Sequence, residues 1–477
     1  MTYPAFAFWA LVVWSVFAPP TTVLILLLGS MPFASLALVP PEYVGGMSIL
    51  PQSMFAGVLI VKVLLPHVLT LSPKLMGVLR LRELGCLALF LVTGILATFI
   101  MPRLYAGEVV VVPMHYRAPT ELLASGQSNF TQTGYVVLSI MTVFAVALIA
   151  EDSKFIKALL LGMVVGGSVC IATGLLDIIA AASGVTRFLE PFRNAGYAFL
   201  INSEVGGMRR VVGLAPEAST YGGMCVVFAS ILALLRHLYP AGRQQLLATV
   251  AALCLTILAI YSTSSTAYVG LAVLGAVYSA NWIRRVFASS EVSQSGLLLE
   301  FLAGVGLAIG LLIIFVVRPD LLDPLTNLVQ EVIFNKPLTT SFYERSQWNS
   351  VAWESVWSTG GLGIGFGSTR TSNWFAAIVS NSGLIGAAFM GAFLAVTLFR
   401  RCSWRTQMTE EMLPALKLSL APALAMAALA TSGPDFGPWV AVVLGAIAGV
   451  AALRPLRSAQ TRASSAFLAE RGSRATA

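Results

Sequence analysis

Apolar stretches close to 20 residues long recur along almost the whole chain, separated by short polar or charged segments. A helix of that length crosses the hydrocarbon core of a bilayer, which is about 30 Å thick. Charged residues make up only 10% of the 477 residues, against about 25% in ordinary soluble proteins. The chain is therefore expected to be an all-α polytopic membrane protein. This excludes a soluble multidomain enzyme, a disordered protein and a small disulfide-bonded scaffold.

The spacing of these stretches predicts about twelve transmembrane helices. They are expected near residues 20–39, 52–70, 84–102, 131–150, 157–182, 217–235, 246–261, 264–281, 297–317, 373–399, 413–430 and 437–453. Residues 5–18 are apolar too, but they end at Pro19-Pro20, which interrupts a helix. They are expected to form either a short extra span or the first part of one broken helix.

The distribution of charge predicts how the chain lies across the membrane. It carries 29 Lys and Arg residues against 21 Asp and Glu residues, a net charge of +8. If the C-terminus is cytoplasmic, the inner segments hold the excess of Lys and Arg, and the outer segments hold slightly more acids than cations. This is the positive-inside pattern. The positive charge therefore indicates topology, and nucleic-acid binding is not expected.

Four regions follow from this topology: N-terminal transmembrane helices, a catalytic region with two large outer loops, a C-terminal transmembrane hairpin and a cytoplasmic tail. Their ranges are 1–182, 183–399 with the loops 183–216 and 318–372, 400–453 and 454–477. A third outer segment, residues 103–130, is also long. Since loops held by a rigid scaffold often carry chemistry, the functional site is expected to face outward. The two large loops are expected to carry short helices.

Arginines gather in the first large outer loop, against the charge bias: Arg187, Arg193, Arg209 and Arg210. A guanidinium group can grip the oxygens of a diphosphate through two parallel N–H donors. Arg209 and Arg210 are therefore candidates for binding an anionic head group. The alternatives are ion pairs with Glu190 and Glu204, or contact with lipid phosphate.

Two acids in this part of the chain are also candidates. Glu217 follows Pro216, which suits the first turn of a helix, so its carboxylate is expected near the positive end of the helix dipole. The same acid at the mouth of a cavity is suited to binding sugar hydroxyls. Asp177 lies inside an expected span, which makes it a functional candidate by default, with a structural role equally open.

The second large loop contains an expected amphipathic helix over residues 341–357. At 100° per residue, Trp353 and Trp357 fall on one side and Glu344 on the other. Tryptophans are typical of a membrane interface, and that role is favoured here over sugar stacking. Glu344 and Arg345 lie at the start of the helix, where they can meet the arginines of the first loop.

Two further stretches have unusual composition for a membrane protein. The glycine run from Gly360 to Gly367 either lets the backbone approach a ligand closely or forms a tight turn packed on the next span. The Ser/Thr-rich turn from Ser262 to Ala267 either satisfies freed backbone groups or forms the polar wall of an outward-facing cavity.

Taken in order, these segments resemble the O-antigen ligase and O-antigen or exopolysaccharide polymerase superfamily. The resemblance covers about residues 200–400. An Arg-x-x-Gly stretch leads into a Pro/Glu/Ser-rich helix start, from Arg210 to Tyr221, and the Ser/Thr-rich turn follows. The largest outer loop then brings Glu344-Arg345, the glycine run and Asn373. Each motif is weak alone, and their order and topology give the resemblance its specificity.

The resemblance implies an integral-membrane glycosyltransferase of the C-type architecture. Such enzymes use undecaprenyl-diphosphate-linked glycans at the periplasmic face of the bacterial inner membrane. It further implies that Arg209 or Arg210, together with Arg345, holds the diphosphate while an acceptor hydroxyl attacks the anomeric carbon. Glu344 is the first candidate for the base or hydroxyl-orienting acid, and Glu217 is the second. The glycan-binding candidates are Tyr221, Trp348 and Arg370.

Two departures from the family pattern favour a polymerase of O-antigen, capsule or exopolysaccharide over a ligase. Lipid A-core ligases look to a histidine in the large outer loop, which has none here, and to an arginine in the Ser/Thr-rich turn, where this chain has Ser265. An O-antigen ligase stays the alternative. A glycan or lipid transporter is the alternative from another class, although no internal repeat is visible. The expected partners are the lipid-linked glycan, membrane lipid and a chain-length regulator.

No metal or other cofactor is expected. The five cysteines include no C-x-x-C pair, and the three histidines do not cluster with them. The resemblance likewise implies metal-independent glycosyl transfer.

Overall fold

The computed structural model describes residues 2–114, 120–150, 152, 154–197, 199–201, 204–205, 208–240, 242–287, 340–400 and 407–452, together with part of 296–309. Within them the chain is mostly helical, with two short strand pairs. Most of the expected span 297–317, residues 318–339 of the second large loop and the tail 454–477 lie outside the described residues.

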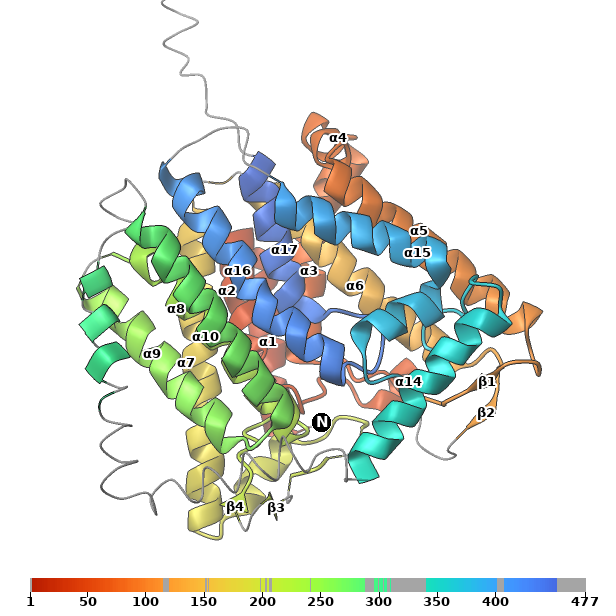
Figure 1. Ribbon diagram of the computed structural model, residues 1–477, viewed down its shortest axis with the longest axis horizontal. Coiled ribbons are helices and arrows are strands. Elements are labelled where there is room, and N and C mark those ends of the chain that lie inside the picture. Colours follow the sequence, from red (N-terminus) through yellow and green to blue (C-terminus); the bar gives the residue numbers. More distant parts are fainter. Residues whose placement is uncertain are drawn as a thin grey trace, which may run out of the picture.

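The helices pack side by side as one bundle (Figure 1). The α-helices are α1 (Tyr3–Phe17), α2 (Pro20–Ser30), α3 (Pro51–Leu69), α4 (Pro73–Leu79), α5 (Arg82–Leu104), α6 (Gln127–Ile149), α7 (Phe155–Ala182), α8 (Ala218–Leu234), α9 (Arg243–Tyr261), α10 (Ser265–Val286), α14 (Thr340–Ser358), α15 (Trp374–Phe399), α16 (Gln407–Ala430) and α17 (Gly437–Ala452). Short 3-10 helices are η1 (Pro41–Val44), η2 (Thr186–Phe192) and η3 (Arg236–Leu238). Strand β1 (Val110–Val111) pairs antiparallel with β2 (Glu121–Leu122), and β3 (Glu204–Val205) pairs antiparallel with β4 (Met208–Arg209).

Eight of the described helices are long and apolar enough to cross a membrane: α3, α5, α6, α7, α9, α10, α15 and α16. Each coincides with an expected span. Their outward faces are apolar as well, and on α5 the side chains of Leu89, Val92 and Leu96 are about half exposed. Water disfavours such a continuous apolar strip, whereas lipid accepts it. An all-α membrane protein is therefore the architecture that the described residues support.

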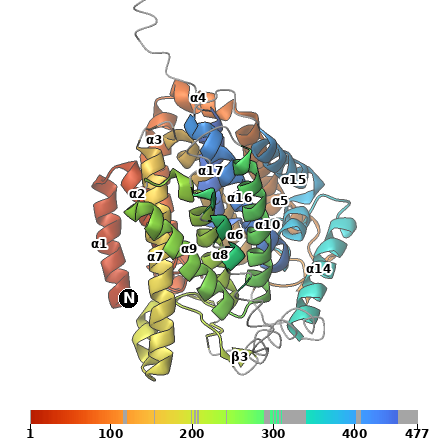
Figure 2. The same ribbon diagram turned by 60° about the vertical axis from the view of Figure 1, so that its left-hand side comes forward.

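The first expected span is wrong in its extent. Helix α2 has 11 residues and ends at Ser30, so it is only ~16 Å long, about half of the hydrocarbon thickness. Helix α1 is separate from it (Figure 2), because Pro19 has an extended backbone with ψ 154° and Pro20 begins the next helix. Residues 31–39 are not helical.

The two ends of the bundle differ in what they carry. Helix α4 lies at one end, whereas α14 and both strand pairs lie at the other (Figures 1 and 2). The positive-inside pattern predicts that the α4 end faces the cytoplasm. The opposite end, hereafter the α14 end, holds the described parts of all three long outer segments.

The glycine run packs into a break in α15. At Gly383 the backbone leaves the helical region, with φ 71° and ψ 178°. The N–H groups of Ile364 and Gly365 donate to the carbonyls of Ser380 and Asn381 at 2.8 and 2.9 Å. An ideal Cβ on Gly365 would lie 2.7 Å from a backbone atom of α5, so the run needs glycine for packing. The tight-turn alternative thus explains the run better than close approach of a ligand.

Candidate functional site

A cavity of ≈ 670 Å³ opens at the α14 end of the bundle. Its walls come from the first turns of α6 and α8, the loop before α8 and the segment that follows the glycine run. The polar groups in the lining include Ser128, Gln132, Tyr135, Glu217, Thr220 and Arg370. Hydroxyl, amide, carboxylate and guanidinium groups are together suited to a ligand rich in hydroxyls and negative charge.

A second pocket of ≈ 350 Å³ lies between α8, α10, α16 and α17. Its lining is mostly apolar, with residues such as Met224, Leu424 and Trp439. Glu217 and Thr220 line this pocket and also the larger cavity. A cavity with several polar groups and a mostly apolar pocket therefore share two lining residues at the start of α8, and we call this place the junction.

Arg210 lies close to the junction. Its Nε donates to the carbonyl of Ser262 at 3.2 Å, which ties it to the Ser/Thr-rich turn. Burial lowers the pKa of Arg210, the carboxylate of Glu217 raises it, and the like charge of Arg345 lowers it. The structure thus brings Arg210, Glu217 and Arg345 within electrostatic reach of one another.

Glu217 occupies the N-cap position of α8, one residue before the first turn in which it was predicted, and its side chain makes no capping hydrogen bond. The hydroxyl of Ser219 donates to its carboxylate, and its main chain pairs with Leu200 of the first outer loop. The Ser/Thr-rich turn serves in part to satisfy backbone, since the hydroxyl of Ser262 donates to the carbonyl of Ala259 at 2.7 Å. Thr266 of the same turn also lines the apolar pocket.

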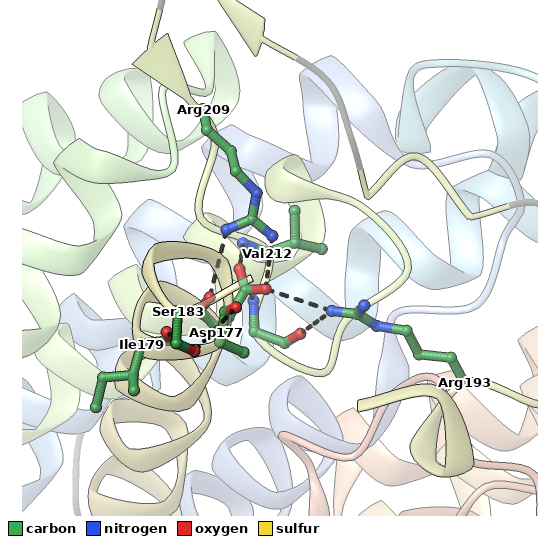
Figure 3. Close-up of polar contacts among 8 residues, drawn as sticks. Asp177, Ile179, Ser183, Arg193, Arg209 and Val212 are labelled. Atoms are coloured by element: carbon green, nitrogen blue, oxygen red, sulfur yellow. Dashed lines mark hydrogen bonds and ion pairs between the residues drawn. The ribbon is translucent and has the colours of Figure 1, made fainter. Parts of the chain in front are cut away.

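Asp177 holds the first outer loop onto α7 (Figure 3). Its side chain is fully buried, and one carboxylate oxygen lies 2.9 Å from the Nη2 of Arg209 and 3.5 Å from the Nη2 of Arg193. The other oxygen accepts from the N–H groups of Val212 and Gly213 at 2.9 and 3.2 Å. One acid thereby receives four donors from a loop that follows it in sequence, which makes its role structural. We call these residues the Asp177 cluster.

This cluster changes the interpretation of Arg209. A diphosphate-binding role was expected for Arg209 or Arg210, and the pairing alternatives were Glu190 and Glu204. Arg209 instead pairs with Asp177, and its side chain is 29% exposed. Its guanidinium is engaged by a buried carboxylate, so Arg210 is the better placed of the two for an anionic ligand.

Tyr221 was predicted to contact the glycan, but the structure buries it. It is 1% exposed, inside the packing of α7 and α8. Its hydroxyl donates to the carbonyl of Cys170 at 3.0 Å. Its ring lies against Gly213, where an ideal Cβ would come within 2.7 Å and where φ is +58°. The Tyr221 ring packs against the turn before α8, and the residue does not line the cavity.

The other two glycan-binding candidates meet. The guanidinium carbon of Arg370 lies 4.3 Å from the centre of the Trp348 ring, a cation–π contact. Arg370 lines the large cavity. This pair joins α14 to the cavity wall, so Trp348 and Arg370 remain candidates for contact with a glycan.

Helix α14 is the helix expected within residues 341–357. Trp353 and Trp357 are 43% and 73% exposed, as an interfacial position requires, whereas Val356 of the same side is buried. Glu344 is half-buried near the start of the helix and does not line either cavity described above. Arg345 contributes its carbonyl to a hydrogen bond from the hydroxyl of Ser372 at 3.3 Å.

Asp435 and Trp439, which line the apolar pocket, were missed from the sequence. The signal that could have revealed Asp435 is its place as a lone acid in the Gly- and Pro-rich turn from Gly433 to Pro438, between two apolar helices. Trp439 lies within an apolar run, where a tryptophan gives no sign of function. Among the described residues, no group of three His, Cys, Asp or Glu side chains is arranged to hold a metal ion.

No family model matches this chain, and no curated protein sequence matches it. The resemblance to O-antigen ligases and polymerases therefore depends on the motifs given above. The family and the activity stay proposals, which the geometry of the site has to support.

Proposed function

We propose that this chain is a membrane glycosyltransferase that joins undecaprenyl-diphosphate-linked oligosaccharide repeat units into a polysaccharide, at the periplasmic face of a bacterial inner membrane. The product is an O-antigen, a capsule or an exopolysaccharide. The observation that carries this proposal is the junction, where a polar cavity of ≈ 670 Å³ meets an apolar pocket of ≈ 350 Å³. A lipid-linked sugar has the same division into a hydroxylated head and an apolar tail.

The charges around the junction suit the diphosphate that links the two parts. Arg210 and Arg345 lie within electrostatic reach of each other, and two guanidinium groups can share the oxygens of one diphosphate. The acceptor hydroxyl attacks the anomeric carbon of the donor, and the bond from that carbon to the diphosphate breaks. Arginines stabilise the charge that develops on the departing diphosphate, and preorganised groups of this kind lower a barrier strongly.

The rest of the cavity suits the glycan. Arg370 with Trp348 offers a charged and aromatic edge, while Gln132 and Thr220 offer hydrogen bonds to sugar hydroxyls. Membrane lipid surrounds the apolar helices, and a chain-length regulator is a further proposed partner. Of the expected acids, Glu217 is the one that lines both cavities, whereas Glu344, like Arg210 and Arg345, lines neither.

Reconstitution in liposomes tests the proposal. The purified chain is supplied with an undecaprenyl-diphosphate-linked oligosaccharide alone, and lipid-linked products are separated by size. We expect longer lipid-linked chains in the absence of any other acceptor. Transfer only to an added lipid A-core acceptor would favour the ligase, and movement of substrate across the bilayer without a new glycosidic bond would favour the transporter. The variant Arg187→Ala, which changes an exposed arginine of the same loop, is the matched control and should retain activity.

A further inference from the structure

Asp435 lies at the polar end of the apolar pocket, in the turn between α16 and α17. Its side chain is partly exposed to that pocket. The N–H of Gly437 donates to one carboxylate oxygen at 3.1 Å, and Phe436 and the hydroxyl of Ser139 on α6 also hydrogen-bond to it. Among the described residues no cation lies within ion-pair distance of Asp435. The carboxylate is thus held in place without being neutralised.

Trp439 supplies a second, independent sign of a ligand in this pocket. It is 6% exposed and lines the pocket from the first turn of α17. Its indole N–H has no hydrogen-bond partner among the described residues. A buried donor without a partner costs free energy. Trp374 in the same lining has a partner, since it donates to the carbonyl of Pro434 at 3.0 Å, whereas the N–H of Trp439 is left unsatisfied.

The two acids expected from the sequence have different surroundings. Glu344 lines neither cavity. Glu217 accepts a hydrogen bond from Ser219 and lies within electrostatic reach of Arg210. Asp435 faces the same pocket as Glu217, and no cation of the described part of the chain contributes to its electrostatics.

We infer that Asp435 is the general base of the proposed glycosyl transfer, and that the polar end of this pocket receives the attacking hydroxyl of the acceptor sugar. The inference depends on the proposed function. In this step the acceptor oxygen forms a bond to the anomeric carbon, and its proton passes to a carboxylate oxygen of Asp435. The bond between the anomeric carbon and the diphosphate oxygen breaks, and its electron pair leaves with the diphosphate. The indole N–H of Trp439 donates to the acceptor sugar.

The electrostatics agree with this assignment. Burial raises the pKa of Asp435 to about 6, while the hydrogen bonds from Ser139, Gly437 and Phe436 lower it. A base works best with a pKa near the working pH. Two other titratable groups lie near Asp435. One is Tyr135 of α6, whose ionised hydroxyl would repel the carboxylate of Asp435. The other is Glu217 at the start of α8, which lines the same pocket. Both favour the protonated form of Asp435 when they are charged.

The variant Asp435→Asn tests the assignment in the reconstituted system. We expect kcat to fall by about 10²-fold or more, because a positioned base contributes at least that much, while KM for the lipid-linked substrate stays close to that of the wild type. Asp435→Glu should recover part of the rate, since it restores a carboxylate. The matched control is Glu108→Gln, which neutralises an exposed acid at the α14 end. Wild-type kcat in Asp435→Asn would overturn the inference while leaving the proposed function intact.

The pH dependence separates a base from a structural residue. The rate of the wild type should rise with pH through a midpoint near 6, because only the deprotonated carboxylate accepts a proton. Ser139→Ala removes a hydrogen bond to the charged form, so the midpoint should move upward by roughly half a pH unit. A midpoint that is the same in both proteins would overturn the inference. If the wild type forms no glycosidic bond at any pH, the proposed function itself fails.

Substitution of Trp439 tests the second half of the inference. Trp439→Phe keeps the apolar bulk but removes the N–H, and we expect KM for the acceptor to rise about three- to tenfold, the effect of one hydrogen bond, with kcat retained. Unchanged kinetics in this variant would remove the pocket from the acceptor site.

Discussion

Arg209 and Arg210 are neighbours in sequence, yet they belong to two regions with opposite character. Arg209 points to the Asp177 cluster, where one buried carboxylate receives four donors from the first outer loop. Arg210 donates to the Ser/Thr-rich turn and lies within electrostatic reach of Glu217 and Arg345. In the first region a carboxylate already accepts from four donors, which leaves little for a ligand. The second region brings two guanidinium groups close to one carboxylate, and this excess of positive charge favours an anion.

Under the proposed function, the difference explains how the chain makes an anion site at the edge of a membrane. A loop rich in arginine needs an internal anion to fold, and Asp177 provides one from inside α7. Burial lowers the pKa of Arg193, and the carboxylate of Asp177 opposes this. With the loop fixed by this pair and by Arg209, Arg210 can be held beside the cavity without an ion partner at contact distance among the described residues. Folding and binding are thereby assigned to different arginines.

The largest effect should come from breaking the Asp177 cluster. Asp177→Ala leaves Arg193, whose side chain is 6% exposed, as a buried charge without its counter-ion. Removing one partner of a buried ion pair costs about 3–5 kcal/mol, so we expect a clear fall in the free energy of unfolding and loss of activity with it. Thermal unfolding in detergent measures the first effect. The double variant Asp177→Asn with Arg193→Gln should regain part of the stability, and an unchanged melting temperature in Asp177→Ala would contradict this role.

The opposite pattern is expected at the junction. Arg210→Ala should lower the rate of polymer formation about 10²- to 10³-fold, the loss seen when one preorganised charge-stabilising group is removed, while thermal unfolding stays close to that of the wild type. Arg187→Ala changes the same residue type in the same loop and should affect neither quantity. If Arg210→Ala unfolds as easily as Asp177→Ala, the two regions have the same role and the comparison fails.

Hydropathy alone predicted the eight long apolar helices. A helix needs about 20 mostly apolar residues to cross the membrane, whichever helices it packs against. Pro216 predicted the start of α8 to within two residues, since the helix begins at Ala218 and Glu217 is at its N-cap position and not in the first turn. The order of the polar segments brought Arg210, Arg345 and Arg370 to the same end of the bundle. These features depend on local pattern and on topology, both of which a sequence carries.

What could not be predicted depends on which way single side chains turn. Arg209 is the last residue of strand β4 and Arg210 follows it directly, yet Arg209 donates to Asp177 and Arg210 donates to Ser262. The sequence does not indicate which of these two arginines pairs with Asp177. Tyr221 and Thr220 are neighbours in the first turn of α8, and their side chains point about 100° apart around the helix. The ring of Tyr221 therefore lies in the core, whereas the side chain of Thr220 lines the cavity. Asp435 was missed because its partner Ser139 is far away in sequence.

The smallest effect should come from the contact between α14 and the cavity wall. Trp348→Leu removes the ring that lies 4.3 Å from the guanidinium carbon of Arg370, and a cation–π contact at a site still reached by solvent contributes about 0.5–1 kcal/mol. We therefore expect KM for the lipid-linked glycan to rise about two- to fivefold, with kcat and thermal unfolding unchanged, and Trp348→Tyr to stay near the wild type. A fall in kcat instead would mean that this pair belongs with the charges of the junction. A fall in stability alone would mean that the pair serves folding, as the Asp177 cluster does. Only a change confined to KM identifies a residue that contacts the substrate without taking part in the reaction.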